Sequence, residues 1–435
     1  MPDGRDGRLG ALTTLGVVEQ PTRAAGRTTG TLDITVTGAD RPGVTGALLE
    51  AVSDGGTEVL DIQQVVVHGQ LTLALVLAPG EDGLAAARAA ATGVAQRLGL
   101  KASFAAGSEE GARPRASRAA VVVLGAPLQA AAVSAVTRSI AHHGANIDRI
   151  RRLSRYPVTT VEFDVSGADV QGLRTELALV ASAVGVDVAV APGGLARRGR
   201  RLVVLDVDST LIQQEVIELL AAHCGRLEEV AAVTARAMAG ELDFEQSLRA
   251  RVSALAGLPA SVLQEVRDEI VLTPGARTLV RTLTRLGFTV GLVSGGFIEI
   301  VGDLARELGI SHARANRLEI RRGRLTGRVV GEVVDRAGKA RALREFAAAE
   351  GLPLSRTVAI GDGANDLDML AAAGLGVAFN AKPVVREQAH TSVNVPFLDP
   401  VLYLLGLTRE EIEEADAQDG TPTAAPTGPG PASLG

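Results

Sequence analysis

Leu202-Val203-Val204-Leu205-Asp206-Val207-Asp208-Ser209-Thr210-Leu211 is the most informative stretch of this 435-residue chain. Its first four residues are apolar, which favours a strand buried on both faces, as in parallel sheets. The strand ends at Asp206 and Asp208. In open α/β sheets, ligands bind outside the carboxyl ends of the strands, so both carboxylates reach the place where a ligand binds. Two carboxylates this close repel each other unless a cation or a proton holds them, and the pair therefore indicates a metal site.

Other stretches place polar residues in the same kind of context. A second apolar stretch, residues 287–293, runs into Ser294, and a third, residues 357–360, runs into the acidic turn 361–366. Lys339 lies between them, just before an alanine-rich helical stretch. Taken singly, Ser294 is also compatible with a helix N-cap, Lys339 with a solvated surface lysine, and the turn with an ordinary loop. Together and in this order, the pieces indicate one functional site.

This order of strand-Asp-x-Asp, strand-Ser, Lys before a helix and strand-Asp-x-x-x-Asp resembles the haloacid dehalogenase superfamily. The resemblance implies an α/β fold with a Rossmann-like parallel sheet and a helical cap, and a phosphatase that uses Mg²⁺. It also implies a role for each motif residue. Asp206 is the nucleophile, Asp208 donates and accepts the proton, and Ser294, the Gly295 N–H and Lys339 contact the phosphoryl group. Asp206, Asp362 and the Asp208 carbonyl hold the metal, Asp366 orients Lys339, and Thr210 fixes the loop.

The segment 211–273 follows the aspartates directly, so we expect it to fold over them as a helical cap, within a phosphatase domain spanning 200–408. Here the resemblance narrows to the phosphoserine phosphatase family. It covers Arg201 to Leu404, with no motif position replaced. It implies that Glu215 faces the substrate ammonium and Arg251 its carboxylate, with Asn365 as a further substrate contact. A planar guanidinium suits a carboxylate because it donates two parallel hydrogen bonds. Arg249 is the alternative to Arg251 if the cap helix is misaligned, and Phe244 is expected to pack within the cap.

The region ahead of the phosphatase domain contains an internal repeat. Each copy, at 30–106 and 117–192, shows the order strand, helix, strand, strand, helix, which favours a ferredoxin-like βαββαβ arrangement. The Gly-x-Asp-x-Pro-Gly turn at residues 38–43 resembles the ACT domain, a regulatory module that binds amino acids at paired interfaces. The resemblance implies an amino-acid effector and a homodimer. The second copy departs from the motif at residues 125–128, so it is expected to serve as a packing partner.

Composition limits the other possibilities. The net charge of −6 gives no particular affinity for polyanions, and the arginine cluster 197–201 lacks interleaved aromatics, so we expect a linker and no nucleic acid. A single cysteine, Cys224, fits a reducing compartment, and we expect a cytoplasmic protein. No segment is expected to span or bind a membrane. The segments 1–29 and 417–435 are expected to be disordered because of their Gly, Thr, Pro and Ala bias.

The sequence therefore predicts a cytoplasmic, Mg²⁺-dependent enzyme that hydrolyses O-phospho-L-serine to L-serine and phosphate, the closing step of serine synthesis. Two alternatives remain open at this stage. The same chemistry serves other small phosphate esters or phosphoproteins, in which case Glu215 and Arg251 have no substrate group to bind. A different class is an amino-acid sensor with a vestigial catalytic domain, against which the intact motif residues argue.

Overall fold

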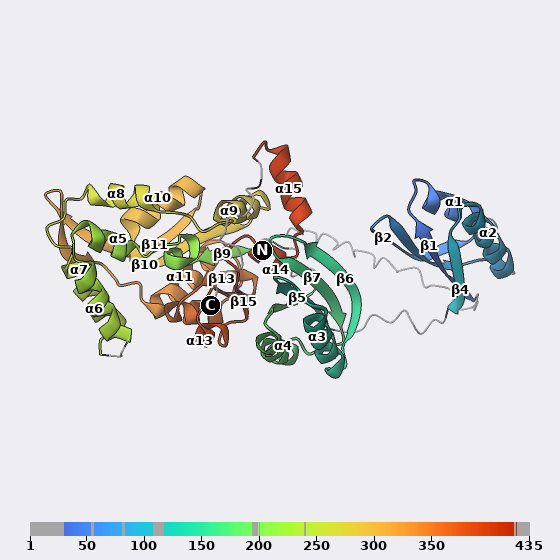
Figure 1. The fold of residues 1–435 in the computed structure, drawn as a ribbon, viewed down its shortest axis with the longest axis horizontal. Helices are drawn as coiled ribbons and strands as arrows, with labels where there is room; N and C mark the ends of the chain where they lie inside the picture. Colours follow the sequence, from blue (N-terminus) through green and yellow to red (C-terminus); the bar gives the residue numbers. More distant parts are fainter. Residues whose placement is uncertain are drawn as a thin grey trace, which may run out of the picture. The chain divides into compact units, whose positions relative to one another are not determined.

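The computed structural model describes residues 30–53, 56–80, 83–107, 117–193, 199, 201–238, 241–421 and 423 (Figure 1). The chain divides into two compact units, Met1–Pro114 and Arg115–Gly435. The segment 1–29, expected to be disordered, lies outside the described residues. None of the described helices is both long and apolar enough to cross a bilayer.

The first unit is one βαββαβ fold. Its elements are β1 (Thr31–Ala39), α1 (Val44–Ala51), β2 (Glu58–Val67), β3 (Gln70–Ala78), α2 (Gly83–Arg97) and β4 (Lys101–Gly107). The strands form an antiparallel sheet in the order β2-β3-β1-β4. Alternate residues of β1 and β3 are buried and pack against one face of each helix, as period-2 strands and period-3.6 helices require.

The second repeat has the same element order and begins the second unit. It comprises β5 (Arg118–Gly125), α3 (Ala130–His142), β6 (Asn146–Ser154), β7 (Thr159–Ser166), α4 (Val170–Val184) and β8 (Asp187–Pro192), with strand order β6-β7-β5-β8. β5 is buried from Ala119 onward, so both faces of its sheet are covered. The predicted pair of ferredoxin-like folds is confirmed.

The rest of the second unit is built on a seven-stranded sheet. Its order is β12-β11-β10-β9-β13-β14-β15, with β9 (Leu202–Leu205), β10 (Thr289–Phe297), β11 (His312–Arg321), β12 (Arg324–Val330), β13 (Thr357–Gly361), β14 (Leu375–Phe379) and β15 (Thr391–Val393). All neighbours are parallel except β11 and β12. β9 is the central strand and all four of its residues are buried, as its aliphatic sequence predicted. The predicted α/β fold is therefore confirmed.

Helices cover this sheet, and a second group forms the cap. The first group is α9 (Ala276–Arg285), α10 (Ile298–Leu308), α11 (Arg336–Ala349), α12 (Leu367–Ala372), α13 (Pro383–Arg386), α14 (Val401–Leu404) and α15 (Arg409–Gln418). Between β9 and α9 the chain forms the cap helices α5 (Val216–His223), α6 (Leu227–Met238), α7 (Phe244–Ser253) and α8 (Val262–Glu269) (Figure 1). The segment that follows the two aspartates is thus helical.

The second repeat and the seven-stranded sheet share one hydrophobic core. Val122 and Leu153 belong to the same buried cluster as Leu398 and Tyr403, which flank and form α14. At the same junction the buried Asp187 carboxylate accepts hydrogen bonds from residues next to and within β15. The second repeat is therefore an integral part of this unit, since removing it would expose that core.

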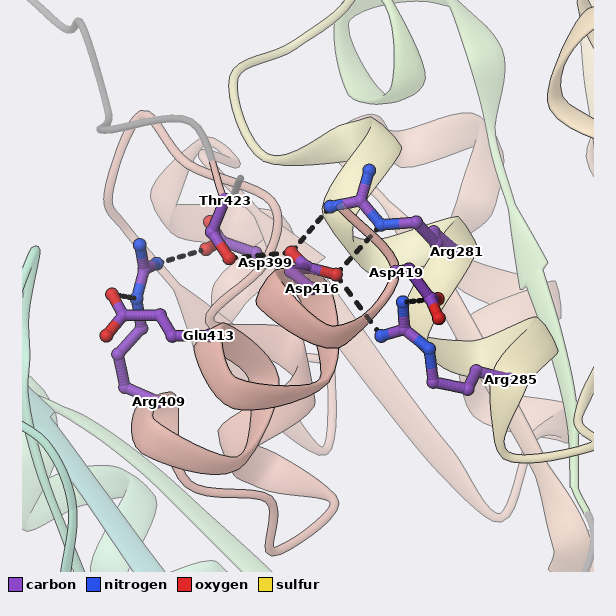
Figure 2. Close-up of polar contacts among 8 residues, drawn as sticks. All are labelled: Arg281, Arg285, Asp399, Arg409, Glu413, Asp416, Asp419 and Thr423. Carbon is purple, nitrogen blue, oxygen red and sulfur yellow. Dashed lines mark hydrogen bonds and ion pairs between the residues drawn. The ribbon is translucent and has the colours of Figure 1, made fainter. Parts of the chain in front are cut away.

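The C-terminal helix α15 is fixed to α9 by a buried ion-pair cluster (Figure 2). The Asp416 carboxylate, which is fully buried, accepts two hydrogen bonds from Arg281 at 2.9 and 2.6 Å and one from Arg285 at 3.2 Å. Paired carboxylate–guanidinium contacts of this kind are the strong, directional ones. The tail expected to be disordered from residue 417 is therefore helical to Gln418, and its residues beyond 423 lie outside the described part of the chain.

Candidate active site

The polar residues singled out from the sequence meet at the carboxyl edge of the seven-stranded sheet. β9 lies between β10 and β13, and its residue Leu205 pairs with Leu292 on one side and Ile360 on the other. The Asp206 N–H donates to the Ile360 carbonyl at 2.9 Å, so the hydrogen-bond pattern between β9 and β13 continues one residue beyond the end of β9. Since parallel strands end at the same edge, Asp206, Ser294 and Asp362 are brought together.

Lys339 lies between two carboxylates at the centre of the site. Its Nζ is 2.8 Å from Asp206 Oδ1 and 2.7 Å from Asp366 Oδ1, and its side chain is only 1% exposed. Burial by itself lowers the pKa of Lys339, but the two adjacent carboxylates outweigh it and raise that pKa above its ordinary value. Burial, and then the charge of Asp366, raise the pKa of Asp206 well above its usual range. The single positive charge of Lys339 therefore does not balance the negative charge of the carboxylates around it.

The carboxylates form an oxygen-rich cluster that fits a hard divalent cation. Oxygen atoms of Asp206, Asp362 and Asp366 all lie within 4.8 Å of one another. Burial, and then the charge of Asp366, raise the pKa of Asp362 to about 6, while Thr210 Oγ1 donates to its Oδ1 at 2.9 Å. Mg²⁺ takes oxygen ligands and is held by a few carboxylates plus phosphate oxygens and water, so this donor set suits it.

Gly361 is required where β13 turns into the acidic loop. A Cβ atom at this position would lie 2.4 Å from the Asp366 carboxyl carbon, well inside van der Waals contact. The Asp366 Oδ2 instead accepts the Gly363 N–H at 3.0 Å. Because its other oxygen binds Lys339, Asp366 holds the lysine and the loop together, in the place expected for an orienting residue.

Asp208 is held by two hydrogen-bond donors on its side of the cluster. Its Oδ1 accepts the Val216 N–H at 2.8 Å, and its Oδ2 accepts the Ser294 hydroxyl at 3.0 Å. Burial raises the pKa of Asp208, while these hydrogen bonds oppose the rise. The Ser294 Oγ also accepts the Gly296 N–H at 2.7 Å. Ser294 was expected to donate to a phosphoryl oxygen, and here its hydroxyl donates to Asp208.

The cap contributes one acidic and one basic side chain. Burial, and then the charge of Asp208, raise the pKa of Glu215 to about 7. Burial lowers the pKa of Arg251, and Glu215 opposes that shift. Ser209 donates to Glu215 Oε1 at 2.7 Å, and its own backbone has φ +56, a left-handed conformation that is uncommon for serine. The turn after the aspartates thus aims a cap residue at the cavity.

Several of these groups line one cavity of about 140 Å³ between the sheet and the cap, although Ser294 and Lys339 are not among its lining residues. Its lining residues are Asp206, Asp208, Glu215, Ile217, Phe244, Leu248, Arg251, Gly295, Gly296, Phe297, Asp362 and Asn365. Arg249, the alternative to Arg251, is instead exposed and paired with Glu245. Phe244 packs against the hydrophobic core, as expected, and it also lines the cavity, where a Cβ on Gly295 would lie 3.2 Å from its ring.

Two residues with a clear place in this geometry were not predicted. Ser209 orients Glu215, and Asn316, which is fully buried, bonds the Gly295 carbonyl and the Val334 N–H. Ser209 lies inside the motif quoted from the sequence, but the bond depends on a backbone conformation that periodicity does not reveal. Asn316 lies in β11, a strand that was not predicted, so nothing in the sequence indicated that this side chain is buried.

Comparisons with known proteins identify the family to which the chain belongs. Residues 203–371 match the haloacid dehalogenase-like hydrolase family, and residues 31–105 and 117–191 each match an ACT domain family. The chain is 61% identical over 388 residues to the phosphoserine phosphatase of Streptomyces coelicolor, covering 89% of this chain and 94% of that protein. It is 53% identical to phosphoserine phosphatase SerB2 of Mycobacterium tuberculosis, covering 89% and 95%. The crystal structure of a probable phosphoserine phosphatase from Vibrio cholerae superposes with a TM-score of 0.52 at 36% identity, covering 70% of this chain and 90% of that one.

Proposed function

The chain belongs to the phosphoserine phosphatase family of haloacid dehalogenase-like hydrolases with ACT domains, and on that basis we propose that it hydrolyses O-phospho-L-serine to L-serine and phosphate. The observation that carries the proposal is the charge pattern of the small cavity. Glu215 and Arg251 face it from the cap, and Asp206 and Asp208 face it from the sheet. An acid and a base on the cap match the ammonium and carboxylate of an amino acid whose phosphate reaches the aspartates.

The volume of the cavity supports a small substrate. At about 140 Å³ it is smaller than the roughly 300–1,000 Å³ typical of pockets for drug-sized ligands. Phe244, Leu248 and Phe297 supply apolar walls, and Asn365 supplies a further polar contact. A phosphoprotein segment would require the cap to move away, whereas a free phosphoamino acid fits beneath it.

In the proposed reaction the Asp206 carboxylate attacks phosphorus and the bond from phosphorus to the serine oxygen breaks. Asp208 gives its proton to that oxygen, which leaves as the hydroxyl of serine. Asp208 then takes a proton from the water that attacks the phosphoaspartate, and phosphate is released. Splitting one displacement into two is the advantage of covalent catalysis. Lys339 and the Gly295 N–H stabilise charge on the phosphoryl oxygens.

We propose that Asp206, Asp362 and the backbone carbonyl of Asp208 hold a Mg²⁺ ion. When bound, Mg²⁺ neutralises negative charge on the phosphoryl oxygens and on the nucleophile. The cluster fits such an ion because its atoms are all oxygen and close together, and because one lysine faces several carboxylates. Asp366 is already engaged by Lys339 and Gly363, so its place is to position the lysine.

The test of the proposed function is phosphate release across a panel of esters, with and without Mg²⁺. We expect phosphoserine to give the highest kcat/KM, with p-nitrophenyl phosphate well below it, and chelation to abolish release from both. A faster reaction with sugar phosphates or phosphopeptides would identify another substrate class. No release from any ester would leave the amino-acid sensor as the better account.

Arg251 is expected to determine affinity for the amino-acid part of the substrate. Losing two charge-assisted hydrogen bonds, worth about 1.5–3 kcal/mol each, should raise the KM for phosphoserine by at least about 100-fold in Arg251→Ala. The KM for p-nitrophenyl phosphate, which has no such carboxylate, should change by less than about threefold. Arg249→Ala is the matched control on the same helix and should leave both values near wild type. Equal losses in the two variants would show that the cap helix is misassigned.

Glu215 should make the preference for phosphoserine depend on pH. Because burial raises its pKa to about 7, the carboxylate that binds ammonium is present above that pH and is lost as pH falls. The ratio of kcat/KM for phosphoserine to that for p-nitrophenyl phosphate should therefore fall up to about tenfold per pH unit below 7. Glu215→Gln should remove this pH dependence and lower the ratio throughout. A ratio in the wild type that does not vary between pH 5 and 8 would contradict the role.

We propose that the first ACT domain binds a small amino acid, such as the product serine, in a cytoplasmic homodimer. The sequence basis is the turn at residues 38–43, where the Asp40 N–H is bonded to the Gly69 carbonyl. Deleting residues 1–114 removes this unit alone and leaves intact the core that the second repeat shares with the catalytic sheet. Serine should shift the melting temperature or the rate of the full chain and have no such effect on the truncation. If both respond alike, the effector acts elsewhere.

A further inference from the structure

Near its end, β10 departs from regular pairing at residues 294–296, the turn proposed to bind the phosphoryl group. Val293 pairs with Arg314 of β11, but the next paired residue of β10 is Phe297, which lies opposite Asn316. Residues 294–296 therefore form a bulge, because four residue steps along β10 lie opposite two residue steps along β11. A bulge removes backbone groups from their regular hydrogen bonds, and where it is buried those groups need other partners.

The Asn316 side chain supplies one such partner. Its Nδ2 donates to the Gly295 carbonyl at 2.8 Å, and its Oδ1 accepts the Val334 N–H at 2.8 Å. The side chain is fully buried, so both of its polar atoms are satisfied inside the protein. Val334 directly precedes Asp335, which caps the helix that bears Lys339. A single amide thus links the bulge to the segment that leads into α11.

A continuous chain of hydrogen bonds runs from Asn316 to Asp208. The Gly295 carbonyl belongs to the peptide whose N–H is that of Gly296, and this N–H donates to Ser294 Oγ at 2.7 Å. Because the serine oxygen accepts there, its own hydrogen is directed to Asp208 Oδ2, 3.0 Å away. In a low-dielectric site, successive hydrogen bonds polarise one another and fix each other's direction.

We propose that Asn316 is a positioning residue for the reaction, which acts through the Gly295–Gly296 peptide and Ser294 to hold Asp208 in place. The inference rests on the proposed function, since it takes Asp208 as the group that moves the proton. Asn316 does not line the cavity, so it affects turnover rather than substrate affinity. Its action depends on the hydroxyl of Ser294, which makes the two residues energetically coupled.

The test is a double-mutant cycle between Asn316 and Ser294. Asn316→Asp keeps an oxygen for the Val334 N–H and replaces the donor to the Gly295 carbonyl with a carboxylate oxygen. It should lower kcat at least about tenfold, with KM within about threefold of wild type. In a Ser294→Ala background the same substitution should lower kcat by less than about threefold, because the chain is already broken. The substrate is phosphoserine, or p-nitrophenyl phosphate if the wild type hydrolyses only that ester, so a wrong substrate assignment does not affect this test.

Two further variants separate positioning from charge and from stability. Asn316→Ala introduces no charge and should lower kcat at least as much as Asn316→Asp; if it does not fold, Asn316→Asp alone carries the test. Asn394→Ala removes part-buried side-chain hydrogen bonds, including one of 2.6 Å to Asp187. It should lower the melting temperature without changing kcat. The proposal is overturned if Asn316→Asp lowers only the melting temperature, if its loss of kcat is equal in both backgrounds, or if Asn316→Ala turns over at the wild-type rate.

Discussion

Asp206→Asn should reduce phosphoserine turnover by roughly four orders of magnitude or more, as loss of a covalent nucleophile does. The amide is nearly isosteric with the carboxylate but cannot form the phosphoaspartate. Substrate should still bind, because Glu215 and Arg251 are untouched. The measurement is single-turnover phosphate release together with binding of phosphoserine by calorimetry. A variant that turned over within about tenfold of wild type would remove Asp206 from the reaction.

The same variant should be at least as stable as wild type when no metal is present. Burial and Asp366 raise the pKa of Asp206, so its ionised form opposes folding at neutral pH, and stability falls as pH rises through that pKa. A neutral amide relieves this repulsion, although it gives up one ion pair to Lys339. Thermal melts in EDTA should therefore show an equal or higher melting temperature. A clear fall would mean that the ion pair outweighs the repulsion.

Lys339→Met is the second substitution with a large expected effect. The methionine leaves the buried Asp206 and Asp366 carboxylates without their cation, which should cost about 3–5 kcal/mol of stability. Removing a fixed positive charge from the phosphoryl site should also lower kcat by at least about a hundredfold. Turnover and denaturant unfolding of the purified variant measure the two effects separately.

A control and a partial rescue separate these effects. Arg341 lies on the same helix as Lys339 and forms an exposed ion pair with Glu332. Arg341→Met should therefore alter stability by less than about 1 kcal/mol, with normal turnover. Adding Asp366→Asn to Lys339→Met removes one uncompensated charge and should restore part of the stability but none of the activity. Recovery of activity in the double variant would show that Lys339 serves only to balance charge.

The strands that carry chemistry were predictable because each is a short apolar segment ending in polar residues. β9 and β13 follow directly from that pattern, and their pairing brings Asp206 and Asp362 together. The cap helix bearing Arg251 was assigned by similarity to known motifs, and the structure directs Arg251 rather than Arg249 to the cavity. The strands β11, β12, β14 and β15 were not predicted, since their place depends on tertiary pairing rather than on local sequence.

What the sequence could not show are contacts that depend on irregular backbone. Ser209, whose backbone is left-handed, donates its hydroxyl hydrogen to Glu215. In the bulge of β10, the Gly295 carbonyl accepts its hydrogen bond from the Asn316 side chain. Both arise from departures from regular dihedrals and register, which residue periodicity does not encode. The core that the second repeat shares with the catalytic sheet could not be predicted either. The sequence of an apolar strand is the same whether the strand packs only on its own helices or also on a neighbouring domain.

The central claim is that Asp206 becomes transiently phosphorylated with the help of a divalent ion. Beryllium trifluoride mimics a phosphoryl group on a carboxylate, so fluorine NMR and a crystal structure of the protein with this mimic and Mg²⁺ test the claim directly. The mimic should be bound to the Asp206 carboxylate, with its fluorine atoms facing Lys339 and the Ser294–Gly296 turn, and it should not bind in EDTA or in Asp206→Asn. A mimic attached to another residue, or full turnover after complete removal of divalent metal, would contradict the account.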